Sequence, residues 1–316
     1  MKLRDRPSDL RDALNVASGA LGLTVRQLEK DYWVTEVLRE LAAGHRTSVL
    51  FKGGTSLSKG WRIIRRFSED IDLLLTSQPG LTTDALLDRI VDTATSICGR
   101  GADVVRRVDG LARVVEVPYP ELPNTPKSPG LRRSILLEPG VRGGPRPHEL
   151  VEIVPFVAEG LSVDVTGGYE DLHPFAIQAL HPARTMVEKL FAVDRLAKAL
   201  LRDPDRRVIG TEARHFYDLF CLADPDHHPA LDLLGDQRVH QELIVDCESI
   251  SARWFPDRAD VRPEAGFHQS PAFTDDAVAD RVRSAFQRTM TELCFPDAPR
   301  PTFDAVQQRL SALDWL

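Results

Sequence analysis

The sequence contains no apolar run close to the roughly 18–20 residues that a membrane-spanning helix needs. Its first six residues lead directly into charged side chains, which argues against a signal peptide. Only four cysteines occur among 316 residues, and they lie far apart without a CxxC pair. These absences argue against a membrane protein, a disulfide scaffold and a zinc site. We therefore expect a cytoplasmic protein with reduced thiols.

Two common phosphate-binding signatures are also missing. Gly54 is followed by Thr-Ser, not by the Lys-Ser or Lys-Thr of a Walker A loop, and the GxGxxG fingerprint of dinucleotide-binding proteins does not occur. No Ser–His–Asp or Cys–His arrangement shows a recognisable local signature, so the sequence offers no case for nucleophilic acyl transfer.

The composition is that of an ordinary globular protein, with 42% hydrophobic and 28% charged residues. The net charge of −7 is distributed unevenly along the chain. Residues 1–218 carry 31 basic and 30 acidic side chains, whereas residues 219–316 carry 9 and 17. The acidic C-terminal third is either a solvated surface or a face that excludes an anionic ligand.

The hydrophobic pattern divides the chain into a mixed α/β half and a helical half. Strands are expected at 48–51, 71–75, 103–107, 112–118, 134–138 and 151–157, with helices at 8–22, 24–44, 57–65 and 83–99. Helices at 182–201 and 211–223 open a helical remainder with loops at 225–229 and 256–274. We therefore predict two domains, residues 1–175 and 176–316.

The segment most informative about chemistry runs from Phe51 to Leu73. A strand ends in Gly53 and Gly54, where the backbone can approach a phosphate, and a helix then begins with free N–H groups. Thr55 and Ser56 add hydroxyl groups at this turn.

Asp70 and Asp72 follow on the next expected strand, two residues apart, so their side chains point to the same face. Two neighbouring carboxylates repel each other unless a hard divalent cation neutralises them. A phosphate cradle beside such a pair is the apparatus of phosphoryl or nucleotidyl transfer. Each half alone has a simpler interpretation, an ordinary turn and a solvated strand face.

The motif FKGGTSLSKG…RRFSEDIDLLL closely resembles the AbiEii/MenT nucleotidyltransferase-like toxins of the DNA polymerase β-type nucleotidyltransferase superfamily. Four further segments resemble the family in the expected order: LEKDYWVTEVLREL (28–41), ILLEPG (135–140), MVEKLFAVDRL (186–196) and RHFYDLFCL (214–222). The resemblance covers about residues 24–222. It implies an α+β fold with a polymerase β-type mixed sheet and helices, followed by a helical C-terminal domain.

The resemblance also implies roles for individual residues. The catalytic residues would be Asp70, Asp72, Lys189 and Asp218, and the metal ligands Asp70, Asp72 and Glu138. The nucleotide would contact Lys52, Gly53, Gly54, Thr55, Ser56, Lys59, Arg66, Ser68 and Lys189.

Several of these assignments have alternatives. Glu152 and Asp164 compete with Glu138 as the third carboxylate, since each lies in an apolar, strand-like run. Lys189 is alternatively a surface lysine, and Asp218 a partner of Arg214 one helical turn earlier. The basic residues from Lys59 to Arg66 alternatively only solvate a helix.

The function that the resemblance implies is nucleotide transfer from a nucleoside triphosphate to RNA, at the 3′ end of tRNA, with Mg²⁺ or Mn²⁺. The protein would then be the toxin of a toxin–antitoxin or phage-defence pair, with a cognate antitoxin protein. Three alternatives remain: a small-molecule acceptor, a protein acceptor, and a nucleotide-binding regulator without turnover.

Overall fold

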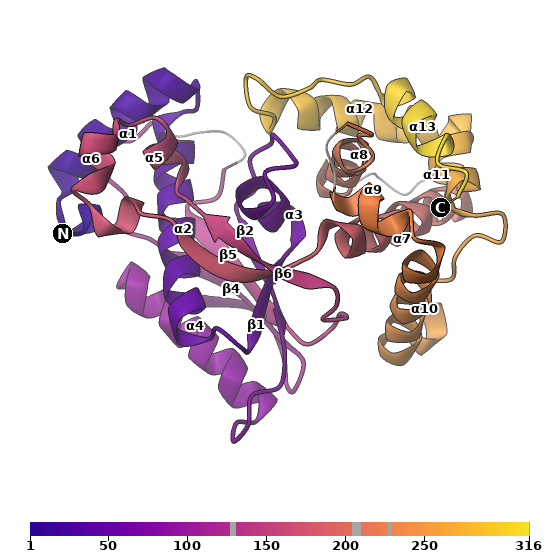
Figure 1. The fold of residues 1–316 in the computed structure, drawn as a ribbon, viewed down its shortest axis with the longest axis horizontal. Helices are drawn as coiled ribbons and strands as arrows, with labels where there is room; N and C mark the ends of the chain where they lie inside the picture. Colours follow the sequence, from indigo (N-terminus) through magenta and orange to yellow (C-terminus); the bar gives the residue numbers. More distant parts are fainter. Residues whose placement is uncertain (127–130, 204–209, 227–228, 316) are drawn as a thin grey trace. The chain divides into compact units, whose positions relative to one another are not determined.

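The computed structural model describes residues 1–126, 131–203, 210–226 and 229–315 (Figure 1). The chain forms two compact units that interleave along the sequence. The first comprises residues 1–61, 67–141 and 148–179, and the second comprises residues 62–66, 142–147 and 180–316. The division predicted at residue 175 stays a prediction about independent domains.

A seven-stranded mixed sheet, in the order β3-β4-β5-β2-β1-β7-β6, forms the centre of the first unit. Its strands are β1 (Val49–Lys52), β2 (Asp70–Leu75), β3 (Asp103–Val108), β4 (Ala112–Pro118), β5 (Ser134–Gly140), β6 (His148–Ile153) and β7 (Phe175–Leu180). Strand β2 pairs antiparallel with β1 and parallel with β5, and β1 is parallel to β7. The mixed sheet confirms the predicted α+β class.

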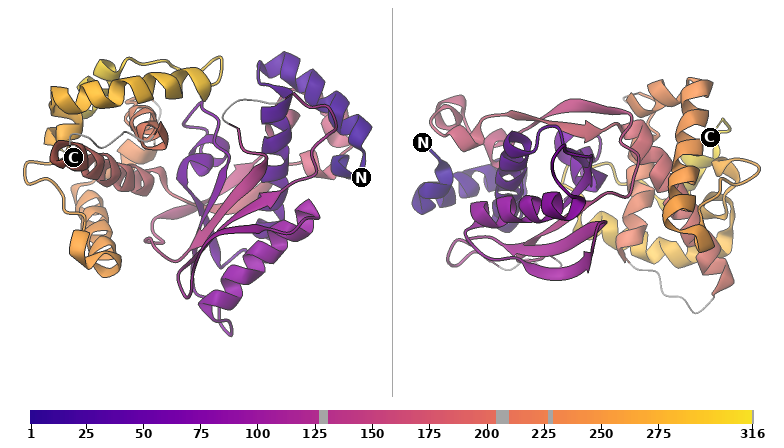
Figure 2. Two further views of the ribbon diagram at one scale, coloured as in Figure 1. Left: turned by 180° about the vertical axis from the view of Figure 1, so that it is seen from behind. Right: turned by 90° about the horizontal axis from the view of Figure 1, so that it is seen from below.

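Helices α2 and α4 lie side by side along this sheet and pack on β4 and β5 (Figures 1 and 2). Arg113 of β4 marks the covered face, because it contacts Asp84 and Asp88 of α4. The helical elements of this unit are η1 (Leu3–Asp5), α1 (Pro7–Leu21), α2 (Val25–Gly44), α3 (Gly53–Thr55), η2 (Ser56–Gly60), α4 (Thr83–Cys98), α5 (Phe156–Glu159), α6 (Val163–Gly167) and η3 (Glu170–Leu172). Helix α2 begins with a capping box, since Thr24 and Gln27 each accept from the other's backbone N–H.

The second unit is helical, as predicted. Its elements are α7 (Pro182–Arg202), α8 (Gly210–Leu222), α9 (Pro229–Leu234), α10 (Gln237–Trp254), η4 (Pro256–Arg258), η5 (Phe267–Gln269), α11 (Pro271–Thr274), α12 (Asp276–Glu292) and α13 (Phe303–Ser311). Helix α8 packs against α7, α12 and α13, and the rings of Phe216, Phe286 and Phe303 form part of the core between them. Within the described ranges, no helix is both long and apolar enough to cross a membrane.

The structure corrects four expected elements. The helix expected over 57–65 ends at Gly60, and Arg62 has a φ of 55°, which an α-helix cannot accommodate. The strand expected over 151–157 spans 148–153, because Pro155 starts a short helix. Strand β7 was not predicted, although residues 175–180 alternate between more and less buried positions. The loops expected at 225–229 and 256–274 contain the start of α9 and the short elements η4, η5 and α11.

Candidate functional site

The glycine turn after β1 lies directly against Asp72. Gly53 has a φ of 76°, a conformation that residues with a side chain rarely adopt. A Cβ atom at Gly53 would stand 2.2 Å from Oδ2 of Asp72. The backbone of the turn therefore lies so close to this carboxylate that a side chain at position 53 would collide with it. Lys52, the last residue of β1, is directly opposite Asp72 in the register of the two strands.

The hydroxyl groups of the turn are used inside the protein. Thr55 Oγ1 donates to the carbonyl of Asp70 at 2.5 Å and is also hydrogen-bonded to Ser68 Oγ at 2.8 Å. Ser56 Oγ donates to the carbonyl of Gly53 at 3.0 Å. Both Thr55 and Ser56 are fully buried. Their described contacts therefore fix the turn to the start of β2.

Three carboxylates share one face of the sheet. Asp70 and Asp72 are partly exposed, whereas the alternate residues Ile71 and Leu73 are buried on the opposite face. Glu138 of β5 is directly opposite Asp72 of β2. Because directly opposed residues of neighbouring strands project to the same side, Glu138 joins the pair.

The other two candidates for the third carboxylate lie elsewhere in the sheet unit. Glu152 is exposed on β6, an edge strand with β1 and β7 between it and β2. Asp164 is exposed on the short helix α6 and not on a strand. Glu138 is thus the candidate that the strand order brings beside Asp72.

The electrostatics of the three carboxylates suit a cation. Burial raises the pKa of Glu138, and the charges of Asp72 and Asp70 raise it further, against the opposing effect of Arg106 and Lys52. Oxygen donors of this kind are the ligands that Mg²⁺ and Mn²⁺ prefer. Among the described residues, no three His, Cys, Asp or Glu side chains converge as a preformed metal cage. The donor chemistry therefore fits a divalent cation, without a closed cage around it.

The side chain of Lys59 is buried in the interior of the sheet unit. Its ammonium group is 2.5 Å from Asp31 Oδ1 and 4.2 Å from the centre of the Phe156 ring, and the residue is only 2% exposed. Asp31 also accepts the backbone N–H of Phe156 at 2.7 Å. The family resemblance had placed Lys59 in the nucleotide site. Because its ammonium group is buried against Asp31, we do not include it in the proposed site.

A second charged cluster is buried in the helical unit. Asp218 of α8 accepts two hydrogen bonds from Arg66, from Nε at 2.7 Å and Nη2 at 2.8 Å. Lys189 of α7 places its Nζ 2.8 Å from Asp218 Oδ2 and 3.2 Å from His215 Nδ1. The partners of Asp218 are therefore Arg66 and Lys189, not Arg214. Lys189 is 7% exposed and is not an ordinary surface lysine.

The protonation states of this cluster follow from its contacts. Burial alone would raise the pKa of Asp218, but the charges of Arg66 and Lys189 hold it far below its usual range. Burial lowers the pKa of His215 to about 3, with the Lys189 charge acting in the same direction. His215 is therefore neutral at pH 7, and its Nδ1 accepts a hydrogen bond from the Lys189 ammonium group.

One charged residue near the carboxylates, Lys30, was not predicted from the sequence as part of the site. Lys30 of α2 is fully buried, forms an ion pair with Glu69 and donates to the carbonyl of Arg132 at 3.0 Å. Burial lowers the pKa of Lys30, against the opposing charges of Glu69 and Asp70. The signal was the charged run Glu29-Lys30-Asp31 inside a helix with many apolar residues.

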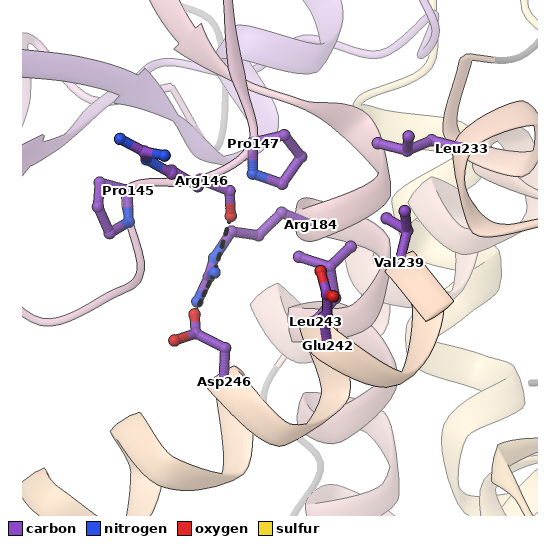
Figure 3. A pocket seen from close by; sticks show the side chains of 9 residues that line it. All are labelled: Pro145, Arg146, Pro147, Arg184, Leu233, Val239, Glu242, Leu243 and Asp246. Atoms are coloured by element: carbon purple, nitrogen blue, oxygen red, sulfur yellow. Dashed lines mark hydrogen bonds and ion pairs between the residues drawn. The ribbon is translucent and has the colours of Figure 1, made fainter. Parts of the chain in front are cut away.

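A cavity of about 450 Å³ lies in the helical unit (Figure 3). Arg184 crosses it toward Asp246, with Nη1 donating to Asp246 Oδ2 and to the carbonyl of Arg146 (Figure 3). Its lining includes none of the predicted site residues.

Comparisons with known proteins identify a matching family and a similar fold. A family model described as "Nucleotidyl transferase AbiEii toxin, Type IV TA system" matches residues 36–309. Among solved structures, the fold is similar to that of MenT4, a nucleotidyltransferase toxin from Mycobacterium tuberculosis. The TM-score is 0.50 and the sequence identity 21%, over 95% of this chain and 93% of that one. No curated protein matches the chain.

Proposed function

The chain belongs to the AbiEii family of nucleotidyltransferase toxins of type IV toxin–antitoxin systems, and from this premise we propose that it transfers nucleotides from a nucleoside triphosphate to the 3′ end of tRNA. The observation that carries the proposal is the register that sets Glu138 opposite Asp72, with the Gly53 backbone against the same aspartate. A carboxylate set beside a glycine turn suits a reaction that brings a triphosphate and a hydroxyl together.

We assign the donor triphosphate to the turn between Lys52 and Gly54. The glycines allow its oxygens to approach the backbone, and Lys52 supplies a positive charge at the end of β1. Thr55 and Ser68 act indirectly, since their hydroxyl groups hold the turn and β2 together. This arrangement orients the triphosphate relative to the carboxylates, which is a large part of the catalytic advantage in phosphoryl transfer.

Asp70, Asp72 and Glu138 would hold a divalent cation, Mg²⁺ or Mn²⁺. The bound cation would lower the pKa of the attacking hydroxyl group and neutralise charge on the leaving pyrophosphate. The phosphate contact of Lys189 stays a prediction from the sequence; within the helical unit, Asp218 and His215 engage two of its three N–H donors. Asp218 would then orient Lys189, and Arg66 would hold Asp218.

The acceptor and the cellular setting belong to the same proposal. Addition of nucleotides to the 3′ end of tRNA would block translation, as a toxin requires. The substrates place the reaction in the cytoplasm, and the cognate antitoxin is the expected protein partner. A role in phage defence is consistent with such a pair.

The decisive experiment is a transfer assay with purified protein, total tRNA, Mg²⁺ and each α-³²P-labelled nucleoside triphosphate in turn. We expect label on tRNA from one or more nucleotides. Asp72→Asn should reduce it by at least about 100-fold, because it removes a carboxylate from the reacting centre. Glu138→Gln should have a similar effect, whereas the control Glu152→Gln on an edge strand should retain activity.

Each other outcome changes a specific part of the proposal. Label on protein, or pyrophosphate release without labelled tRNA, would move the acceptor away from tRNA. Loss of activity in Glu152→Gln but not in Glu138→Gln would overturn the third-carboxylate assignment. Nucleotide binding without turnover under any condition would contradict the proposed reaction.

A further inference from the structure

One row of residues crosses five strands of the sheet on the face that carries the carboxylates. Strands β4 and β5 pair from Ala112 opposite Gly140 to Pro118 opposite Ser134. This register places Val114 opposite Glu138, and the neighbouring pairs extend the row to both sides. From β3 to β1 the row runs through Arg106, Val114, Glu138, Asp72 and Lys52. Neighbouring strands are about 4.8 Å apart, so the backbones of Arg106 and Glu138, two strands apart, are separated by about 10 Å.

Arg106 is the outermost member of this row. It is exposed on β3, one of the two edge strands of the sheet, and makes no hydrogen bond or ion pair with any described residue. Its charge does act on Glu138, whose pKa it helps to hold down. The next residue differs: Arg107 is opposite Arg113 on the other face and pairs with Asp109 at 2.7 Å and Asp88 at 3.7 Å.

Strand β3 pairs irregularly with its neighbour β4. Its register with β4 shifts between Val104 and Arg106, as in a β-bulge. Bulges re-aim side chains next to functional sites. Val105, the extra residue at this shift, is 58% exposed and leaves apolar surface next to Arg106. Val104 is 64% exposed but is opposite Val115, so it lies on the other face of the sheet with Arg107 and Arg113.

The geometry of an in-line displacement indicates from which side of the carboxylates the acceptor approaches. In an in-line reaction the attacking oxygen and the leaving pyrophosphate lie on opposite sides of the phosphorus. The proposed function places the pyrophosphate at the Gly53 turn, on the β1 side of Asp72. The attacking hydroxyl group must then arrive from the β5 side, where β4 and β3 complete the sheet.

We propose that the β3 edge binds the 3′-terminal segment of a single-stranded RNA acceptor, with Arg106 contacting a backbone phosphate and Val105 contacting a base. The inference rests on the proposed function, because that function defines the side from which the acceptor enters. An unpaired guanidinium group suits a phosphodiester, which it can bind with two hydrogen bonds. A single strand fits better than a duplex, since its bases are free to contact Val105.

The test compares two neighbouring arginines that carry the same charge. Arg106→Gln and Arg107→Gln remove one positive charge each from the same exposed strand but from opposite faces. Binding of a fluorescently labelled single-stranded RNA with a free 3′-hydroxyl group is measured by anisotropy over a range of salt concentrations. For Arg106→Gln we expect binding weaker by about tenfold at low salt and a salt slope smaller by about 0.7, the value for one lost phosphate contact.

In the transfer assay, Arg106→Gln should raise the KM for the RNA acceptor without changing the KM for the nucleotide. Equal salt slopes for the two variants, or no binding of RNA by the unaltered protein, would overturn the inference. Binding of an extended peptide at β3 in place of RNA would also overturn it. If RNA binding depends on Arg106 but no transfer occurs, the proposed function fails while the docking surface stands. If transfer proceeds with an unchanged acceptor KM in Arg106→Gln, the docking surface fails while the function stands.

Discussion

Like charges lie close together at the candidate site. Glu138 is partly buried and directly opposite Asp72, so its ionisation is opposed both by burial and by a neighbouring carboxylate. A carboxyl group whose pKa is raised by folding stabilises the protein below its ordinary pKa of 4.5, and this contribution is lost as the pH rises through the folded-state value. Repulsion between the carboxylates is thus strongest at neutral pH when no cation is bound.

Glu138→Gln should therefore increase the free energy of unfolding at neutral pH, although it reduces transfer by at least about 100-fold. Its advantage should disappear below about pH 4, where Glu138 is already protonated. Added Mg²⁺ should stabilise the unaltered protein more than the variant, because only the former keeps all three carboxylates. Urea denaturation at both pH values, with and without Mg²⁺, measures these differences.

The matched control is Glu152→Gln, which removes an exposed acid from β6. It should change the urea midpoint little at either pH. An equal response of both variants would show that the effect comes from net charge and not from the repulsion at Asp72.

At the scale of elements, a single buried ion pair joins helix α8 to the segment that precedes β2. Arg66 and Asp218 are 152 positions apart in sequence, and both are almost completely buried. Because Asp218 also meets Lys189, one carboxylate balances two positive charges. Removing Arg66 takes two hydrogen bonds from a buried carboxylate and leaves Lys189 as its remaining ionic partner, which costs more than the pair itself contributes.

Arg66→Gln should lower the free energy of unfolding by about 3–5 kcal/mol. Arg65→Gln is the matched control, because Arg65 pairs with Asp297 where both side chains are largely exposed, and its loss should cost about 0–1 kcal/mol. Chemical denaturation of both variants gives the comparison. Similar costs for the two arginines would contradict the buried-pair interpretation.

The same cluster predicts an acid response. The pKa of Asp218 is lowered by folding, so its contribution is present above the ordinary value of 3.8 and is lost as the pH falls through the folded-state value. Asp218→Asn should therefore lose less stability than the unaltered protein when both are acidified below about pH 4.

At the scale of the whole molecule, the two units cannot be separated by dividing the chain at one position, because each consists of three stretches of sequence. Residues 62–66 and 142–147 belong to the helical unit although both segments lie between parts of the sheet unit. Arg66, inside the nucleotidyltransferase motif, is held by a residue of α8. Integrity of the motif therefore depends on the C-terminal half of the chain.

A fragment ending at Ala179 should consequently fail to unfold cooperatively, since Arg66 would lose Asp218 and two segments would lose their packing partners. Near-ultraviolet circular dichroism during urea denaturation tests this expectation. A sharp transition with an unfolding free energy near that of the full chain would show that the sheet unit is an independent domain.

Much of the fold and part of the site could be predicted from the sequence. Periodicity predicted the division into a sheet-bearing and a helical half, because burial of one face leaves a repeat of two or 3.6 residues in each element. The two-residue spacing of Asp70 and Asp72 predicted that they share a face, and two consecutive glycines predicted a turn where the backbone could approach a phosphate. These are local consequences of backbone geometry.

Only the tertiary structure decided which distant residues became neighbours. It placed Glu138, and not Glu152, beside Asp72 by pairing β5 with β2. It also paired Asp218 with Arg66 in place of Arg214, and buried Lys59 against Asp31. It also aligned Arg106 with the carboxylate row through strand β4. The physical reason is that strand order and helix packing are selected by the burial of the whole core, and no local spacing encodes a contact between residues more than a hundred positions apart.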